Sequence, residues 1–125
     1  MLRPRAVDHV GIIVTDMDRS LRFYQALGME LLHLPRRPGG AAALKIGDKE
    51  LNVFCNPAAA GAERPQRLDH LCLEMDAATI DEVVAALGEA GLTVASGPVA
   101  RSDGTALFVH DPDGARIELL VKHER

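Results

Sequence analysis

The sequence repeats itself once, and this repeat constrains the fold more than any other feature of the chain. Residues 7–10 (VDHV) recur 61 positions later as residues 68–71 (LDHL), and a helical pattern follows each copy. The predicted elements after both copies come in the same order, a strand, a helix and three strands. Because a half of this size cannot bury its apolar face alone, we expect the halves to pack together or with another chain. Chance repetition of the Asp-His pair is the alternative, which the matching element order disfavours.

The first half predicts a helix that follows the first of four strands. Thr15, with Asp18 three positions later, resembles a capping signal and predicts a helix that ends at Gly28. A loop at residues 35–40 (PRRPGG) is expected to be exposed. Runs of β-branched and alternating apolar residues predict the strands, at residues 7–14, 29–34, 41–46 and 50–55.

The second half predicts the same order after a polar connector rich in alanine and proline. Apolar residues three and four positions apart predict a helix from Ile80 to near Gly91, and residues 97–104 are expected to form a loop. The strands of this half are expected at residues 68–75, 92–95, 106–110 and 115–121. The sequence therefore predicts a single α+β domain, built from a βαβββ module at residues 1–55, a connector at 56–67 and a βαβββ module at 68–125.

Composition excludes several classes of function for this chain of 125 residues. The 14 Lys and Arg against 18 Asp and Glu give a net charge of −4, which argues against a nucleic-acid partner. No apolar run approaches the ~20 residues that span a bilayer, and the N-terminus lacks a secretory signal. Cys55 and Cys72 are therefore expected to be free thiols in a cytoplasmic protein that binds neither nucleic acid nor membrane.

Strand alternation directs His9, His70 and Glu118 toward polar faces, opposite the apolar faces that the helices are expected to cover. Placing an imidazole or a carboxylate on such a concave face costs free energy unless the group is paired or binds a cation. Two imidazoles and one carboxylate from separate strands suit one divalent metal ion (zinc, nickel, iron, manganese or cobalt), with positions open for substrate or water. Ordinary hydrogen bonding of isolated strand histidines is the alternative.

The same alternation directs Phe54, Cys72 and Phe108 toward these faces, where they are candidates for the wall of a substrate pocket. Core packing is the alternative for all three. Three arginines in predicted loops are candidates to close over an anionic substrate, with plain solvation as the alternative; they are Arg36, Arg37 and Arg101. His33 and His123 are assigned no role.

Several of these segments resemble the vicinal oxygen chelate superfamily, which includes glyoxalase I, bleomycin and fosfomycin resistance proteins and extradiol dioxygenases. The resemblance covers nearly the whole chain, and the Asp-Pro-Asp-Gly turn followed by Ile-Glu is among its most specific signals. The matching segments are residues 7–11 (VDHVG), 18–24 (DRSLRFY), 27–29 (LGM), 68–71 (LDHL) and 111–118 (DPDGARIE). The resemblance implies paired βαβββ modules that form an open barrel around a metal ion, and a homodimer.

The resemblance also implies roles for individual residues. His9, His70 and Glu118 match the first, third and fourth ligand positions, and Glu118 is the expected catalytic residue. The second position falls on Asn52, where glyoxalase I has a carboxylate and a related epimerase has an amide. Asn is a weak ligand that cannot act as a base, so coordination by Asn52 and a role as a hydrogen-bonded spacer in the pocket both stay open. Ile13 stands where family glyoxalases have an arginine that holds glutathione, which disfavours glutathione as substrate.

These features predict a metal-dependent, glyoxalase-like enzyme that chelates two neighbouring oxygens of a small substrate. Isomerase or lyase chemistry of the lactoylglutathione lyase type is preferred. An extradiol-type dioxygenase is the second interpretation, because its two-histidine, one-carboxylate set is present but Phe108 replaces its tyrosine. A metal-free drug-binding protein, like the bleomycin resistance proteins, is the third. The presence of three ligand residues disfavours it.

Overall fold

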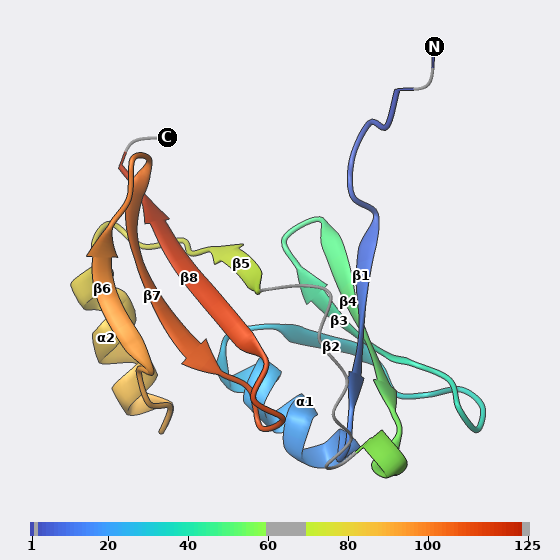
Figure 1. Ribbon diagram of the computed structural model, residues 1–125. Coiled ribbons are helices and arrows are strands. Elements are labelled where there is room, and N and C mark those ends of the chain that lie inside the picture. Colours follow the sequence, from blue (N-terminus) through green and yellow to red (C-terminus); the bar gives the residue numbers. More distant parts are fainter. Residues whose placement is uncertain (2, 60–69, 124–125) are drawn as a thin grey trace. The chain divides into compact units, whose positions relative to one another are not determined.

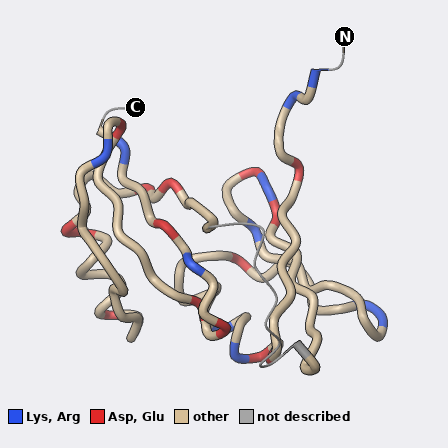
Figure 2. The backbone as a smooth tube through the Cα atoms, viewed as in Figure 1, with Lys and Arg blue, Asp and Glu red and all other residues tan. Residues whose placement is uncertain are grey.

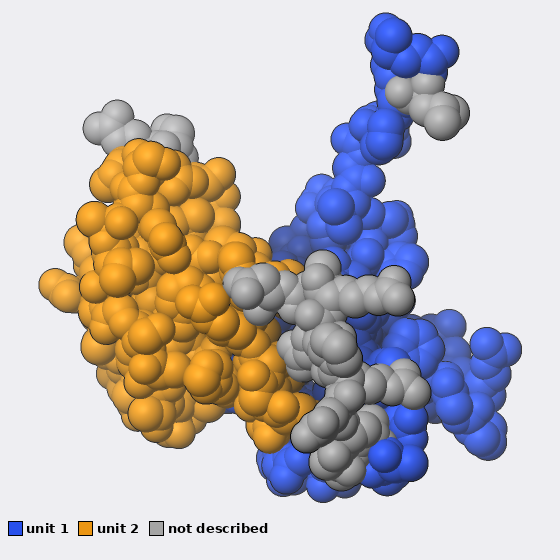
Figure 3. Space-filling model, in the orientation of Figure 1, with its two compact units in different colours: residues 1–63 blue, residues 64–125 orange. Residues whose placement is uncertain are grey.

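The computed structural model describes residues 1, 3–59 and 70–123. The chain divides into two compact units, Met1–Glu63 (unit 1) and Arg64–Arg125 (unit 2), which are coloured separately in Figure 3. In the residues that the structure describes, each unit has one four-stranded sheet and one α-helix (Figure 1). Within the described residues, neither helix has the length and apolar character needed to cross a bilayer.

Unit 1 follows the order strand, helix and three strands. Its strands lie in the sheet order β1-β4-β3-β2, with β1 parallel to β4 and the other neighbours antiparallel. The helix packs against β2 and β4 (Figure 1). The elements are β1 (His9–Val14), α1 (Met17–Ala26), β2 (Glu30–His33), β3 (Ala42–Ile46), β4 (Lys49–Cys55) and a 3-10 turn, η1 (Pro57–Ala59).

Unit 2 repeats this order and topology. Its sheet order is β5-β8-β7-β6, with β5 parallel to β8, and its helix contacts β7. The elements are β5 (Leu71–Glu74), α2 (Ile80–Glu89), β6 (Ser96–Ala100), β7 (Gly104–His110) and β8 (Arg116–Lys122). The predicted α+β class and the two βαβββ units are confirmed.

Alternation along the strands separates an apolar core face from a polar face. In β4 the side chains of Leu51 and Val53 are fully buried, whereas Glu50 and Phe54 are exposed. The buried side chains of unit 1 include Tyr24 of α1, which packs against the strands and meets the ring of Phe23 edge to face at 5.0 Å. In unit 2 the core is made by aliphatic side chains, among them Leu73, Val83, Leu87, Leu107, Val109, Ile117 and Leu119. Burial of these apolar side chains is the main source of stability for each unit.

Three details of the secondary structure differ from the sequence-based expectation. Asp16, and not Thr15, caps α1, because its Oδ1 accepts a hydrogen bond from the backbone N–H of Arg19 at 3.0 Å. The strand expected at residues 92–95 is irregular, and part of the expected 97–104 loop is instead the edge strand β6. Pro98 is tolerated there because an edge strand has a side that needs no N–H donors. The connector predicted at residues 56–67 lies largely outside the described residues.

Candidate metal and substrate site

Glu118 is the buried acidic group on the polar face of unit 2. The residue is only 7% exposed, and two basic side chains hold its carboxylate. Oε1 lies 2.9 Å from Nε2 of His70, and Oε2 lies 3.6 Å from Nε of Arg101. The structure therefore brings together two of the three predicted metal ligands, His70 and Glu118. It also places the Arg101 side chain against the Glu118 carboxylate. The sequence makes Arg101 a candidate to close over a substrate, and this ion pair engages it elsewhere.

The His70–Glu118 pair fits the donor set of a divalent metal ion. Two ligands at right angles around such an ion, each about 2.1 Å from it, lie about 3 Å apart. The 2.9 Å between Nε2 and Oε1 matches that spacing, although a hydrogen bond has the same length. The ion pair with Arg101 would keep Oε2 oriented, as groups behind a ligand commonly do.

Cys72 shares this face and is linked to Glu118. Cys72 and Glu118 are opposite each other in the parallel β5–β8 pairing, and their side chains are hydrogen-bonded, with the thiol as donor. The residue as a whole is exposed, but partial burial of its sulfur raises the pKa of the Cys72 thiol, and the negative charges of Glu118 and Asp103 raise it further. The nearby Arg101 opposes this shift only in part. Cys72 is therefore held as a neutral thiol beside the carboxylate.

Phe108 lies beside Glu118 in the antiparallel β7–β8 pairing. Its ring stands edge-on to the imidazole of His70, with centroids 6.1 Å apart and planes at 78°. The guanidinium carbon of Arg116 lies 4.1 Å from the ring centroid, and that of Arg101 lies 5.7 Å away. Phe108 is buried, with 4% of its surface exposed, and its ring contacts restrict the side chains of His70, Arg101 and Arg116.

His9 is the candidate ligand of unit 1, and its neighbour in sequence orients it. Nδ1 of His9 lies 2.9 Å from Oδ2 of Asp8. A carboxylate can only accept, so Nδ1 donates this hydrogen bond, and Nε2 is the ring nitrogen that would bind a metal ion. This contact gives the Asp of the repeated Asp-His pair a role in the first copy. Asp69, in the second copy, lies outside the described residues.

Asn52 occupies the position in unit 1 that Glu118 occupies in unit 2. Gly11, two residues after His9, is opposite Asn52 in the β1–β4 pairing, while Cys72, two residues after His70, is opposite Glu118 in the β5–β8 pairing. The two halves thus present an amide and a carboxylate at equivalent sites. The neighbours on the next strand differ in bulk, because Ala43 pairs with Asn52 and the ring of Phe108 pairs with Glu118.

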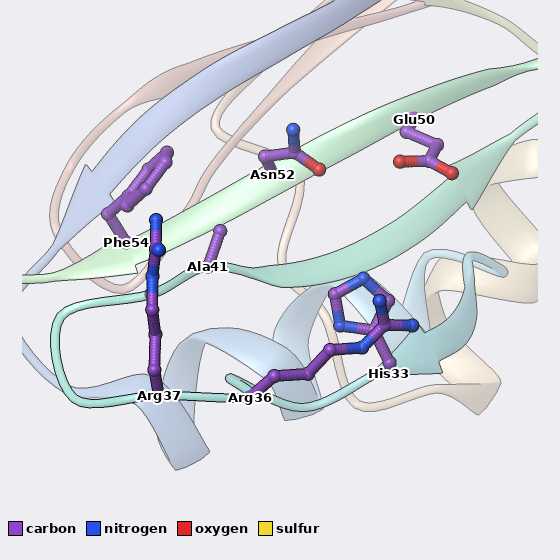
Figure 4. Close-up of a pocket in the computed structure, with 8 residues that line it drawn as sticks. His33, Arg36, Arg37, Ala41, Glu50, Asn52 and Phe54 are labelled. Carbon is purple, nitrogen blue, oxygen red and sulfur yellow. The ribbon is translucent and has the colours of Figure 1, made fainter.

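A pocket of about 440 Å³ opens on the polar face of unit 1 (Figure 4). We call it the β2–β4 pocket, since β2, β4 and the loop between β2 and β3 supply its walls. Its lining residues are His33, Arg36, Arg37, Gly40, Ala41, Glu50, Asn52 and Phe54. It contains two residues predicted to line a pocket, Asn52 and Phe54. His33 could not be assigned to a pocket from the sequence, because its place depends on the path of the chain after β2, whereas Glu50 shares the alternation of Asn52.

No three His, Cys, Asp or Glu side chains gather into a metal-binding group within residues 1, 3–59 and 70–123 as described. His9 belongs to unit 1, and His70 and Glu118 belong to unit 2. The convergence of all three around one ion therefore stays a prediction, as does the assignment of Cys72 and Phe108 to a substrate pocket.

Two βαβββ units with polar faces carrying histidine, carboxylate and amide side chains define the class as a glyoxalase-type α+β protein. Comparison with known proteins gives the family. Residues 6–119 match the Glyoxalase/Bleomycin resistance protein/Dioxygenase superfamily, and the chain belongs to it.

Individual relatives agree with this membership. The chain is 32% identical to a lactoylglutathione lyase of Haemophilus influenzae over 122 residues, which cover 90% of this chain and 89% of that protein. It is also 32% identical to a glyoxalase domain-containing protein of Mycosarcoma maydis over 129 residues, covering 94% and 69% of the two chains. A solved glyoxalase/dioxygenase from Nostoc punctiforme is similar with a TM-score of 0.78 and 29% identity, covering 99% of this chain and 97% of that one.

Proposed function

We propose that this protein is a metal-dependent, glyoxalase-like enzyme that chelates two neighbouring oxygens of a small substrate and catalyses an isomerase or lyase reaction. The observation that supports this most directly is the 2.9 Å separation between Nε2 of His70 and Oε1 of the buried Glu118. The orientation of His9 by Asp8 supplies the third candidate ligand. The similarity to a lactoylglutathione lyase favours isomerase or lyase chemistry over ring cleavage. We further propose that the protein is a cytoplasmic homodimer.

In this proposal each residue of the site has a separate role in the reaction. A divalent ion held by His9, His70 and Glu118 would supply Lewis acidity toward two adjacent substrate oxygens. Glu118 would accept a proton from the substrate carbon, and the ion pair with Arg101 supports this role because it orients the second carboxylate oxygen. Asn52 takes up no proton, but its amide donates a hydrogen bond to a substrate oxygen. Glu118 is therefore the proposed proton acceptor.

Metal binding tests the first half of this proposal. The wild-type protein is expected to bind about one equivalent of zinc, nickel, iron, manganese or cobalt per chain, measured by elemental analysis and by titration calorimetry. His70→Ala removes a ligand and is expected to weaken binding by at least about 100-fold. His123→Ala is the matched control, because His123 is an exposed histidine of unit 2 beyond the end of β8. Wild-type protein that binds none of these ions would overturn the enzyme assignment in favour of a drug-binding protein.

Activity tests the second half. The metal-loaded protein is expected to isomerise adducts of small α-oxo aldehydes with thiols, and Glu118→Gln is expected to lower kcat by about 100-fold or more. Oxygen uptake by the iron-loaded protein with catechols would instead assign it as a ring-cleaving dioxygenase, and would contradict the preference for isomerase chemistry.

A further inference from the structure

We propose that the β2–β4 pocket binds the anionic end of a small ligand, a carboxylate or a phosphate, through the guanidinium groups of Arg36 and Arg37. Calling this ligand the substrate rests on the proposed function, whereas the anion binding itself does not. The pocket lies entirely within unit 1, so the argument needs nothing from unit 2.

The two guanidinium groups are charged, and the part of the chain that the structure describes supplies no partner for them. Within the described ranges of the chain, no hydrogen bond or ion pair engages either side chain. The two arginines are consecutive and lie at the tip of the β2–β3 loop, where the tube in Figure 2 is blue. In Figure 4 the guanidinium of Arg37 points toward Phe54, and Arg36 and His33 line the other side of the same pocket. Two neighbouring positive charges that no carboxylate of the described residues pairs with raise the local affinity for an anion.

The loop holds these side chains in place through its backbone. Pro35 and Pro38 flank the arginine pair and restrict the backbone on both sides. The carbonyl oxygen of Arg37 accepts a hydrogen bond from the N–H of Gly40 at 3.0 Å. A Cβ atom on Gly40 would lie 3.1 Å from that same oxygen, so a larger residue there would require the turn to shift by a few tenths of an ångström. A loop that is ordered in advance loses less entropy when it binds a ligand.

The remaining walls define the rest of the ligand. Phe54, 40% exposed, and the methyl group of Ala41 form an apolar surface beside Arg37, which suits a flat or aliphatic group. Glu50 lies four residues before Phe54 on β4, about 13 Å away along an extended strand. Its carboxylate disfavours a second anionic group at that end and favours one that donates hydrogen bonds. The ligand class is thus a small molecule with one anionic group, an apolar middle and a neutral polar end.

The pocket also adjoins a predicted metal ligand. His9 is directly opposite Glu50 in the β1–β4 pairing, and Asn52 lies within the pocket. An anion anchored by Arg36 and Arg37 would extend along β4 toward His9. This arrangement makes the loop a determinant of substrate class.

Titration calorimetry with four probes tests this inference: inorganic phosphate, phenyl phosphate, benzoate and the neutral benzamide. The full chain is measured both as purified and after treatment with EDTA. We expect phenyl phosphate or benzoate to bind with a Kd in the range of about 1 mM or tighter, and benzamide to bind far more weakly. The double variant Arg36→Gln/Arg37→Gln is expected to weaken anion binding by about tenfold or more.

The matched control is Arg5→Gln/Arg22→Gln, which removes the same charge from two exposed positions of unit 1 outside the pocket. It is expected to leave the affinity within about twofold, and circular dichroism checks that both double variants fold. Stronger binding of phenyl phosphate or of benzoate identifies which anion the pocket prefers. Equal weakening by both double variants, unchanged affinity in Arg36→Gln/Arg37→Gln, or no binding of any anion overturns the inference. Anion binding that EDTA abolishes places the anion on the metal, which overturns this pocket while supporting the proposed function.

Discussion

The substitution Gly104→Ala is expected to destabilise unit 2 strongly. Gly104 begins β7, is buried, and is opposite Lys122 in the β7–β8 pairing. A Cβ atom at this position would overlap the carbonyl oxygen of Val121 and would lie 2.9 Å from Cα of Lys122. Both atoms belong to the backbone of β8, so no side-chain rotation relieves the overlap. The strands must separate locally, because the contact with Lys122 is at least 0.5 Å shorter than the 3.4 Å of ordinary contact.

The magnitude follows from the cost of overpacking. Inserting a methyl group into a filled site costs about 1–3 kcal/mol, and a clash with backbone belongs at the upper end, near 3 kcal/mol. For a chain of this size that corresponds to a fall in Tm of about 12 °C. Gly88→Ala is the matched control in the same unit, because a Cβ atom on this exposed helical glycine meets nothing within 4 Å. It is expected to stabilise the protein by about 0.5–1 kcal/mol.

Urea denaturation followed by circular dichroism measures both variants. The two free energies of unfolding should differ by about 4 kcal/mol, with wild type between them. A free energy of unfolding for Gly104→Ala within about 0.5 kcal/mol of wild type would refute the close approach of β7 and β8 at this end of the sheet.

Three further predictions concern single side chains. Ser20→Ala is expected to stabilise the protein by about 1 kcal/mol in urea denaturation, because the fully buried Ser20 hydroxyl has no hydrogen-bond partner among the described residues and Ala favours the helix. Asp111→Ala is expected to cost about 2 kcal/mol, because Oδ1 of the buried Asp111 accepts hydrogen bonds from two backbone N–H groups of the β7–β8 turn, at 2.9 and 2.7 Å. In EDTA-treated protein, the raised pKa of Cys72 is expected to move the alkylation of its thiol by iodoacetamide to higher pH than for a thiol in a short peptide. Glu118→Gln is expected to move that alkylation back toward lower pH, as peptide-level mass spectrometry would show.

Each of these has an outcome that contradicts it. A loss of stability in Ser20→Ala would mean that the hydroxyl has a partner, such as a water molecule. Asp111→Asn keeps an oxygen acceptor, so an Asn variant as unstable as the Ala variant would remove the turn hydrogen bonds from the explanation. An unchanged pH profile for Cys72 in Glu118→Gln would show that the carboxylate does not control the thiol.

The arrangement of strand residues was accessible from the sequence because side chains alternate with a period of two. That rule alone placed Glu50, Asn52 and Phe54 on one face of β4, and Cys72 and Glu118 on one face of unit 2. The pairing of His70 with Glu118 follows once the strands are adjacent, since the repeated order of elements makes β5 and β8 equivalent to β1 and β4.

Features that depend on the path of the chain through space were less accessible. The Gly97–Pro98 pair is typical of a loop, yet it lies within β6, because Ser96 and Val99 on either side of it pair with β7. Thr15 and Asp16 are both good capping residues, and only the backbone geometry decides that Asp16 caps α1. His33 is an ordinary strand residue in the sequence, and it lines a pocket because the following loop turns back over β4. Neither the ion pair of Arg101 with Glu118 nor the position of Arg36 in the wall of the pocket has a local signature in the sequence.

Unit 1 carries the amide of Asn52 at the position where unit 2 carries the carboxylate of Glu118. This difference affects the net charge of the proposed metal centre. If a divalent ion bound to two neutral imidazoles and the single carboxylate of Glu118, as proposed above, one positive charge would be left over, and an acidic residue in place of Asn52 would cancel it. That positive charge would favour an anionic ligand, as the arginines of the β2–β3 loop also do. The two units therefore share one topology but differ in chemistry. Unit 2 carries the buried carboxylate of Glu118, whereas unit 1 carries an amide at the equivalent position and the arginine pair that favours anions.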